Sequence, residues 1–367
     1  MRIAVPREIK PEEFRVGVTP DSAREYLQQG HAVAVEAGAG IGSGFSDAEY
    51  EAAGCRIEHD KARLFAEAEM IIKVKEPLPE EFGLFREGQI LYTYLHLAAD
   101  RRLTEALLSA GVIGVAYETV QEADGSLPLL TPMSQIAGRL AVQEGAKYLE
   151  KPFGGRGVLL GGVPGVRKGK VTILGGGIAG TNACKMALGI GADVTILDIS
   201  ARRLSELDDL FGARVQTLYS NPHNIERTVR DADLVIGAVL IPGAAAPKLV
   251  RRAHLKTMTP GAVIVDISVD QGGCVETTRP TTHANPVFVE EGVVHYCVAN
   301  MPGAVSATST LALTSVTNRY GLKIAGLGIE KALADNAAIR AGLNCHTGRL
   351  TNRPVAEAHG LPYFAWE

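Results

Sequence analysis

Three glycines stand between an apolar run and a helical run in the order Gly-x-Gly-x-x-Gly, at Gly175, Gly177 and Gly180. The run Lys170–Leu174 predicts a buried strand, and Thr181–Leu188 predicts a helix. The first glycine permits a tight turn, the second lets a ligand approach the backbone, and the third lets helix and strand pack closely. The N–H groups at the start of the helix attract a pyrophosphate. The order predicts a dinucleotide-binding site, with a plain glycine turn as the weaker alternative.

An acidic residue closes the next expected strand. Val194–Leu197 is apolar, and Asp198 follows it 18 residues after Gly180 (198 − 180 = 18). A carboxylate at that position accepts hydrogen bonds from a ribose 2′-hydroxyl and repels a 2′-phosphate, which favours NAD over NADP. Arg202 and Arg203 follow closely in the sequence and could neutralise such a phosphate. They favour the competing interpretation, in which NADP is also accepted.

Polar side chains also close three buried runs elsewhere: Lys73 and Lys75 end Met70–Lys75, His96 follows Gln89–Leu95, and Asp270 follows Ala262–Val269. Ligands of doubly wound sheets bind outside the carboxyl ends of the strands, so these groups are candidates for one shared site. A lysine can hold a carboxylate or polarise a carbonyl, and histidine and aspartate can move protons. Each also has a structural interpretation, as a solvated strand end, a hydrogen-bonded core histidine or a turn-forming aspartate. The residue pattern leaves both interpretations open.

Other chemistries find little support in the sequence. It has no His-Glu-x-x-His and no paired cysteine spacing, and His295-x-Cys297 and Cys345-His346 are fragments with two ligands each, so no metal site is expected. No Gly-x-Ser-x-Gly elbow is present. The pair Gly169-Lys170 lacks the glycine spacing and hydroxyl residue of a nucleotide triphosphatase loop.

The elements that must position these residues alternate between strand and helix. Such alternation predicts an α/β fold of parallel sheets with helices on their faces. We expect two doubly wound parallel-sheet domains, with a Rossmann-type NAD-binding domain inserted into a discontinuous substrate domain. The expected boundaries are 1–128 for the first part of the substrate domain, 129–305 for the inserted domain, and 306–367 for a C-terminal helical part.

Composition narrows the class of protein. The 367 residues suggest two or three domains, and the charge sum of 37 − 41 = −4 supplies no basic excess for binding nucleic acid. The uncharged stretch Gly292–Asn318 carries too many polar residues for a membrane span. Five scattered cysteines and a strand-like start at Arg2–Val5 indicate a reducing, cytoplasmic location.

With these motifs in view, the chain resembles the alanine dehydrogenase/pyridine nucleotide transhydrogenase alpha-subunit family, and alanine dehydrogenase in particular, over essentially its whole length. The stretches that carry the resemblance are Met1–Glu8, Phe14–Pro20, Lys73–Pro77, Thr93–His96, Met133–Gly138, Gly175–Gly180 and Asp266–Gly273. One departure is Gln135, where the family often has glutamate; it lies beside Ser134 and little consequence is expected.

The resemblance implies roles for individual residues. Arg15 and Lys75 are expected to hold the carboxylate and carbonyl of the substrate, and His96 and Asp270 to handle protons. Lys75, and not Lys73, is expected to be the functional lysine. The implied surroundings of the cofactor are Ser134, Gly175, Gly176, Gly177, Ile178, Ala179, Gly180, Asp198, Arg203, Ser220, Val239, Leu240, Ile267, Ser268, Val269, Asp270, Arg279, Val298, Ala299, Asn300 and Met301.

The implied reaction is the reversible oxidative deamination of L-alanine to pyruvate and ammonium, with NAD as the cofactor, in a homohexamer without nucleic-acid or membrane partners. Two other classes of protein remain as alternatives. A transhydrogenase component that works with a membrane partner needs no amino-acid site, and a non-catalytic NAD-binding protein needs no proton-handling groups. The joint presence of Arg15, Lys75, His96 and Asp270 favours the dehydrogenase.

Overall fold

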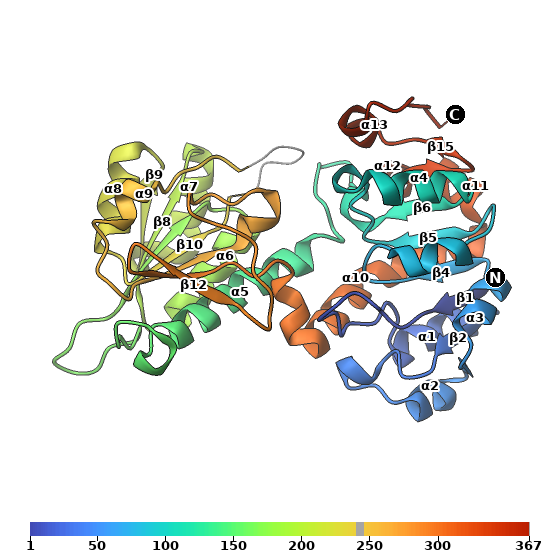
Figure 1. Cartoon of the computed structure of the whole chain (residues 1–367), viewed down its shortest axis with the longest axis horizontal. Helices are drawn as coiled ribbons and strands as arrows, with labels where there is room; N and C mark the ends of the chain where they lie inside the picture. The colour runs from blue at the N-terminus through green and yellow to red at the C-terminus, as the bar shows by residue number, and fades with distance from the viewer. Residues whose placement is uncertain (240–245, 367) are drawn as a thin grey trace. The chain divides into compact units, whose positions relative to one another are not determined.

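The computed structural model describes residues 1–239 and 246–366, which form two compact units. The first unit contains Met1–Met133 and Gly303–Glu367, and the second contains Ser134–Pro302 (Figure 1). The chain therefore leaves the first unit once, builds the second from one continuous segment, and returns. Each unit has its own sheet, with helices packed on it.

The first unit is built on an eight-stranded sheet with the order β15-β14-β6-β5-β4-β1-β2-β3. The strands are β1 (Arg2–Val5), β2 (Ala32–Glu36), β3 (Arg56–Glu58), β4 (Met70–Ile72), β5 (Ile90–Thr93), β6 (Ile113–Ala116), β14 (Leu343–His346) and β15 (Arg349–Leu350). The first six pair in parallel, whereas β14 is antiparallel to β6 and β15 is antiparallel to β14. The expectation of a purely helical C-terminal part was therefore wrong, because this part also extends the sheet by two strands.

Helices cover both faces of this sheet. Successive side chains of a strand point to opposite faces, so neighbouring residues of one strand pack against helices on opposite sides. Its α-helices are α1 (Pro20–Gln28), α2 (Asp47–Ala53), α3 (Lys61–Glu67), α4 (Arg101–Ser109), α10 (Ser306–Leu327), α11 (Ile329–Asp335), α12 (Ala337–Gly342) and α13 (Arg353–His359). On one face Leu91 packs in a core with residues of α3, α4 and α13. On the other face the hydroxyl of Tyr92 donates to the backbone oxygen of Thr317 in α10 at 3.0 Å.

The second unit has a seven-stranded sheet with the order β12-β13-β11-β10-β7-β8-β9. Its strands are β7 (Lys170–Leu174), β8 (Asp193–Asp198), β9 (Val215–Tyr219), β10 (Leu234–Gly237), β11 (Val263–Asp266), β12 (Val287–Glu290) and β13 (Val293–Tyr296). Only the edge strand β12 runs antiparallel to its neighbour. Its helices are α6 (Ile178–Gly189), α7 (Ala201–Phe211), α8 (Pro222–Asp231) and α9 (Arg252–Leu255), and α5 (Thr131–Tyr148) begins at the unit boundary.

Both sheets are wound in the same way. The order β3-β2-β1-β4-β5-β6 in the first unit corresponds to β9-β8-β7-β10-β11-β13 in the second. In each, the chain starts in the middle of the sheet, fills one side, and crosses back to fill the other. The strand order thus reverses between β1 and β4 and between β7 and β10, and ligands of such sheets bind where it reverses. The predicted doubly wound α/β class is confirmed, with antiparallel strands added at the edges.

Two further features bear on the sequence-based expectations. Across the described part of the chain, no helix has the length and apolar character that a membrane crossing needs. The five cysteines are buried free thiols. Burial raises the pKa of the Cys55 thiol to about 11 and that of Cys345 to about 12.

Candidate active site

Two positions of the glycine-rich turn of the second unit, Gly175 and Gly180, have no room for a side chain. Gly175 follows β7 with a φ of +100°, and a Cβ there would lie 2.6 Å from the backbone oxygen of Ala238. A Cβ at Gly180 would lie 1.8 Å from the backbone oxygen of Gly175, so helix α6 can approach β7 only without a side chain there. By contrast, a Cβ at Gly177 would meet nothing within 4 Å. The turn leaves open space at the start of α6, where the helix N–H groups lie.

Asp198 and Arg203 hold this turn from the neighbouring strand and helix. The carboxylate of Asp198, at the end of β8, accepts the N–H of Gly176 and the N–H of Ser200, each at 2.8 Å. Arg203 donates through Nε to the backbone oxygen of Gly176 at 2.7 Å, and through its two terminal nitrogens to Thr181 and Glu206, also at 2.7 Å. Each of the three guanidinium nitrogens of Arg203 therefore donates one hydrogen bond to the protein.

Other residues expected around a cofactor occupy the same carboxyl edge of this sheet. Ser220 follows β9 and donates its N–H to the backbone oxygen of Asp198 at 2.9 Å. Val239 follows β10, and its backbone oxygen accepts the hydroxyl of Ser268 at 2.6 Å. Leu240 lies outside the described residues. Of the remaining expected residues, Ile178 and Ala179 lie in α6, and Ser134 lies in α5. Ile267 and Val269 flank Ser268. The last four follow β13: Val298, Ala299, Asn300 and Met301.

Arg279 sits near the edge strand of the second unit. Its guanidinium lies 4.2 Å from the ring centre of Phe288 in β12, and Phe288 stacks on His295 of β13. These contacts connect Arg279 to the antiparallel edge of the sheet.

The strand ending at Asp266 is shorter than expected. Strand β11 stops at Asp266, and Ile267–Gln271 forms a 3-10 helix, so the expected strand Ala262–Val269 was wrong in its last three residues. Asp266 is fully buried and accepts the N–H of Ser268 at 3.1 Å, the N–H of Val275 at 3.2 Å and the hydroxyl of Thr278 at 2.7 Å. Asp270 lies in the 3-10 helix and is exposed. The structure thus separates a buried structural aspartate from an accessible one.

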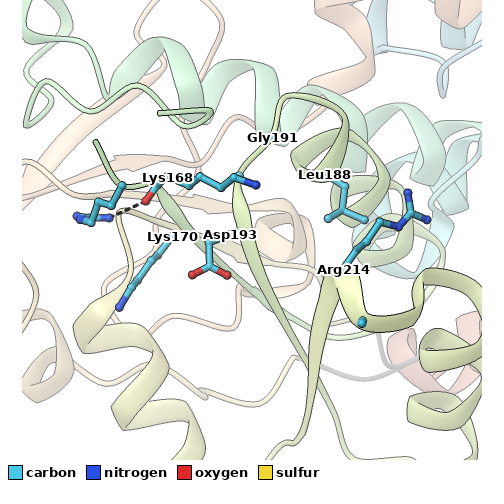
Figure 2. Close-up of a pocket in the computed structure, with 9 residues that line it drawn as sticks. Lys168, Lys170, Leu188, Gly191, Asp193 and Arg214 are labelled. Atoms are coloured by element: carbon cyan, nitrogen blue, oxygen red, sulfur yellow. Dashed lines mark hydrogen bonds between the residues drawn. The ribbon is translucent and has the colours of Figure 1, made fainter. Parts of the chain in front are cut away.

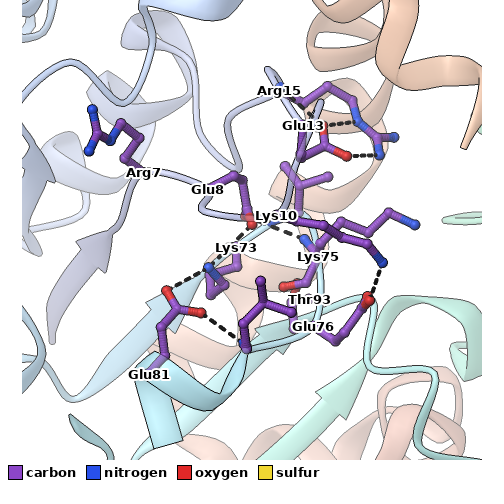
Figure 3. Close-up of polar contacts among 12 residues, drawn as sticks. Arg7, Glu8, Lys10, Glu13, Arg15, Lys73, Lys75, Glu76, Glu81 and Thr93 are labelled. Carbon is purple, nitrogen blue, oxygen red and sulfur yellow. Dashed lines mark hydrogen bonds and ion pairs between the residues drawn. The ribbon is translucent and has the colours of Figure 1, made fainter. Parts of the chain in front are cut away.

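In the first unit, the two candidate lysines have different environments. Strand β4 ends at Ile72, so both lie beyond it and strand alternation does not apply to them. Lys73 is fully buried, and its Nζ pairs with Glu8 at 3.2 Å and Glu81 at 3.0 Å (Figure 3). Lys75 is partly buried, and its Nζ pairs with no carboxylate of residues 1–239 and 246–366. Burial, together with the nearby Arg15 cation, lowers the pKa of Lys75 below its usual value.

Arg15 lies near Lys75, and its side chain is held by Glu13 of the same loop. Its side chain is 2% exposed, and it donates through Nε to Glu13 at 2.7 Å and through Nη2 to the other oxygen of Glu13 at 2.6 Å. Nη1 lies 3.0 Å from the sulfur of Met133. Burial alone would lower the pKa of Arg15, but the hydrogen bonds and charge of Glu13 raise it above its usual value. Arg15 therefore stays charged although it is buried.

His96 is an exposed residue, so its interpretation as a core histidine was wrong. Strand β5 ends at Thr93, and His96 follows in the left-handed conformation with a φ of +49°. This backbone is held by Glu118, which accepts the N–H of His96 at 2.6 Å. The imidazole Nδ1 lies 3.3 Å from Glu76, whose other oxygen pairs with Lys10. Burial would raise the pKa of Glu76, but His96, Lys75 and Lys10 bring it well below its usual value, so Glu76 is ionised.

The structure therefore brings Arg15, Lys75 and His96 to one edge of the first sheet, at the ends of β4 and β5 and in the loop after β1. Asp270 and the expected cofactor residues belong to the second unit. The sequence reasoning missed four carboxylates: Glu13 and Glu76, which contact the side chains of Arg15 and His96, and Glu8 and Glu118, which accept the backbone N–H groups of Lys75 and His96. Glu8 and Glu76 lie within the stretches that carry the family resemblance, which was the only signal for them.

A cavity of about 490 Å³ lies at the opposite end of the second sheet (Figure 2). Lys170 at the start of β7 and Asp193 at the start of β8 line it, together with Lys168 and Arg214. The glycine-rich turn follows the other end of β7. Because ligands of this fold bind at the carboxyl ends of strands, the cavity is not the candidate nucleotide site. Among the described residues, no group of three metal-ligating side chains occurs either there or elsewhere.

Comparison with known proteins agrees with the two units. Residues 4–137 match the model of the alanine dehydrogenase/PNT N-terminal domain, and residues 141–353 match that of the alanine dehydrogenase/PNT C-terminal domain. The alanine dehydrogenases of Halomonas elongata and Geobacillus stearothermophilus are 57% and 58% identical, and each alignment covers 99% of this chain and 98% of the relative.

Solved structures agree with the sequence relatives. An L-alanine dehydrogenase superimposes with a TM-score of 0.96 at 54% identity, over 98% of this chain and 99% of that one. A transhydrogenase from Sinorhizobium meliloti superimposes with a TM-score of 0.82 at 25% identity, over 96% of this chain and 99% of that one. The two family models and the full-length relatives lead to one conclusion: the chain belongs to the alanine dehydrogenase/PNT family.

Proposed function

We propose that the protein catalyses the reversible oxidative deamination of L-alanine to pyruvate and ammonium with NAD, the second unit binding the dinucleotide and the first binding the substrate. The observation that carries this proposal is the set of Arg15, Lys75 and His96 at one edge of the first sheet. Cations that bind a carboxylate stand there beside a group that can carry a proton. A transhydrogenase component requires no such set.

The second unit fits a dinucleotide on the observations above. The turn at Gly175 and Gly180 accepts no Cβ, and the space above Gly177 is open, as a pyrophosphate against the backbone requires. Asp198 stands at the end of β8, where it can accept a ribose hydroxyl. Bound NAD supplies the acceptor for the hydride that leaves the substrate Cα. The remaining tasks belong to the side chains of the chain itself.

Lys75 is the cation best placed to meet the substrate carboxylate or carbonyl. Lys73 is neutralised by two acids and Arg15 is held by Glu13, whereas Lys75 pairs with no carboxylate in the described residues. The charge-assisted hydrogen bond that an ammonium group donates to a carboxylate is among the stronger ones in proteins. Lys75 thus binds the anionic group, and Arg15, which stays charged, adds its positive potential.

His96 carries a proton during interconversion of the amine and the ketone. Nδ1 faces the ionised Glu76, which fixes the orientation of the ring, and this leaves Nε2 to exchange a proton with the substrate or with water. We assign Asp270, exposed in the second unit, as the other proton-handling group. An imidazole can both donate and accept a proton, which suits a reaction that both releases and consumes protons.

The test is the appearance of NADH absorbance when the purified protein receives NAD and L-alanine, with other amino acids and 2-hydroxy acids assayed in parallel. We expect a rate that depends on L-alanine and a reverse rate with pyruvate, ammonium and NADH. A protein that binds NADH by fluorescence but gives no alanine-dependent signal would overturn the proposal.

The cofactor preference is a first specific prediction. We expect NAD to be used at least ~10²-fold more efficiently than NADP, since a phosphate placed against a carboxylate costs several kcal/mol and 1.4 kcal/mol is tenfold. Arg203 is held by its bonds to Gly176 and Thr181, and its charge is paired with Glu206, which weakens its attraction for a phosphate. Asp198→Ala should narrow the gap while Arg202→Ala leaves it unchanged. Equal kcat/KM values for the two cofactors in the wild type would contradict this assignment.

The pH dependence of pyruvate binding is a second prediction. Lys75 attracts an anion only when protonated, and its pKa is lowered by burial and by Arg15. The KM for pyruvate should therefore rise as the pH increases through this lowered value, before an ordinary lysine would titrate. Pyruvate has no group that titrates in this range. The alkaline rise should be absent in Lys75→Met, and a KM that stays constant up to the usual lysine pKa would contradict the role.

We also propose a homohexamer, which the resemblance implies, and a cytoplasmic location, which the five free thiols support. Light scattering on the purified protein, with the mass divided by that of one chain, checks the first statement. A monomer at the concentrations used for assays would contradict it.

A further inference from the structure

We propose that Glu8 is a positioning residue for Lys75, with Lys73 as the buried counter-cation that keeps Glu8 in place. The inference rests on the proposed function, because it gives Lys75 the substrate-binding role. It concerns the residues behind Lys75, which touch neither the substrate nor the cofactor.

Glu8 grips the backbone from which the Lys75 side chain extends. One carboxylate oxygen accepts the N–H of Val74 at 2.7 Å and the N–H of Lys75 at 3.3 Å. The other oxygen lies 3.2 Å from Nζ of Lys73, and the Glu8 side chain is only 3% exposed (Figure 3). A single buried carboxylate thus fixes three consecutive residues after the end of β4.

The same short segment is held from its other side. The hydroxyl of Tyr117 donates to the backbone oxygen of Lys73 at 3.1 Å, and the hydroxyl of Thr93 donates to the backbone oxygen of Lys75 at 3.1 Å. The backbone oxygen of Val74 accepts the N–H of Tyr94 at 3.3 Å. Loops outside a sheet are ordinarily mobile, but this one has its N–H and C=O groups satisfied on both sides. The backbone that carries the Lys75 side chain is therefore held in one position.

The arrangement of charge also favours a role in function. Glu8 and Glu81 face Lys73, and Lys61 lies 3.4 Å from both Glu81 and Glu36, so three acids and two bases form one ion-pair network. The ammonium of Lys75 makes no ion pair within this network of described residues. Because Lys73 satisfies the carboxylate of Glu8, that acid can hold the Lys75 backbone while the ammonium remains available for an incoming anion.

Substitutions at Glu8 and Glu81 test the proposal. Both acids pair with Lys73, but only Glu8 accepts the N–H groups of Val74 and Lys75. Glu8→Ala should lower kcat/KM for L-alanine and raise KM for pyruvate by about 10²-fold, the usual effect of misplacing a binding group by about 1 Å. Its KM for NADH should stay unchanged. Glu8→Gln keeps an acceptor oxygen, so it should recover part of the loss.

Glu81→Gln is the matched control. It also removes one carboxylate from Lys73, so its melting temperature should fall about as far as that of Glu8→Gln, while its kcat/KM stays within about threefold of wild type. Equal kinetic losses in the two glutamine variants would overturn the proposal, as would a folded Glu8→Ala with wild-type kinetics or a parallel rise in the KM for NADH.

A readout independent of catalysis separates the inference from the proposed function. Amide hydrogen exchange at Val74 and Lys75 should accelerate in Glu8→Ala and remain slow in Glu81→Gln. A wild-type protein that ignores L-alanine would refute the function, whatever this exchange shows. An active wild type with unchanged exchange in Glu8→Ala would refute only the positioning role.

Discussion

Asp270→Asn is expected to lower kcat for L-alanine by ~10²–10⁴-fold, the usual effect of losing a positioned acid–base group. Asparagine keeps the shape and most of the hydrogen-bonding capacity of aspartate but has no basic form. Asp270 is exposed in a 3-10 helix and lies four residues after the end of β11 (270 − 266 = 4). Steady-state kinetics and NADH fluorescence measure the effect, and the affinity for NADH should be retained.

Asp266→Asn is the natural comparison, because Asp266 is buried and accepts hydrogen bonds from Ser268, Val275 and Thr278. The amide would place two N–H donors where two backbone N–H groups, a hydroxyl and the thiol of Cys274 already converge, so the free energy of unfolding of this variant should fall. A turn-forming aspartate would tolerate asparagine almost freely. If kcat of Asp270→Asn stayed within a few-fold of wild type, Asp270 would be a structural residue.

The second large loss of activity is expected for a substitution at Lys75, the lysine that makes no ion pair among the described residues. Lys75→Met should reduce kcat/KM for L-alanine by about 10²–10³-fold, comparable with the loss of one donor that stabilises charge in a transition state. Its melting temperature should be preserved, because the substitution strands no carboxylate of the described residues. Binding of NADH, followed by fluorescence, should also be unaffected.

Lys73→Met should lower the stability of the protein more than it lowers kcat/KM. It leaves Glu8 and Glu81 buried without their shared cation, and breaking a buried ion pair costs about 3–5 kcal/mol. The free energy of unfolding from urea titration measures this cost. Similar stability in the two methionine variants, or a Lys75→Met enzyme with normal kcat/KM, would show that the lysine roles are assigned wrongly.

The part of the fold predicted best was the part with strong local rules. The glycine spacing before a helix allows few backbone geometries, so the turn at Gly175–Gly180 and the parallel strands around it followed from the sequence. The ends of strands did not. Polar and apolar residues still alternate beyond Ile72, as Lys-Val-Lys, and beyond Asp266, as Ile-Ser-Val, so the strand-like pattern extended β4 to Lys75 and β11 to Val269. The short strand β14, Leu-Asn-Cys-His, lacks β-branched residues and forms because β6 offers an edge.

The residues of the candidate site also divide into those that local sequence patterns could predict and those that they could not. Lys75 and His96 could be proposed because they follow buried runs. Their supporting acids could not, because a contact such as that between Glu8 and Val74 joins residues 66 positions apart and leaves no mark in the local pattern. Likewise, the exposure of His96 depends on Glu118, which holds its backbone in a left-handed turn from the end of another strand.

The burial of the cysteines offers a practical probe of opening in each unit. Cys55 and Cys345 lie in the first unit, and Cys184, Cys274 and Cys297 lie in the second. A thiol that is covered and has a raised pKa reacts with an alkylating reagent only when its surroundings open. Labelling followed by peptide mass analysis would therefore report how often each sheet loosens, cysteine by cysteine, without any engineered tag. If the second unit binds NAD as proposed, added NAD should slow the labelling of Cys184, Cys274 and Cys297, and the labelling of Cys55 and Cys345 provides the internal comparison.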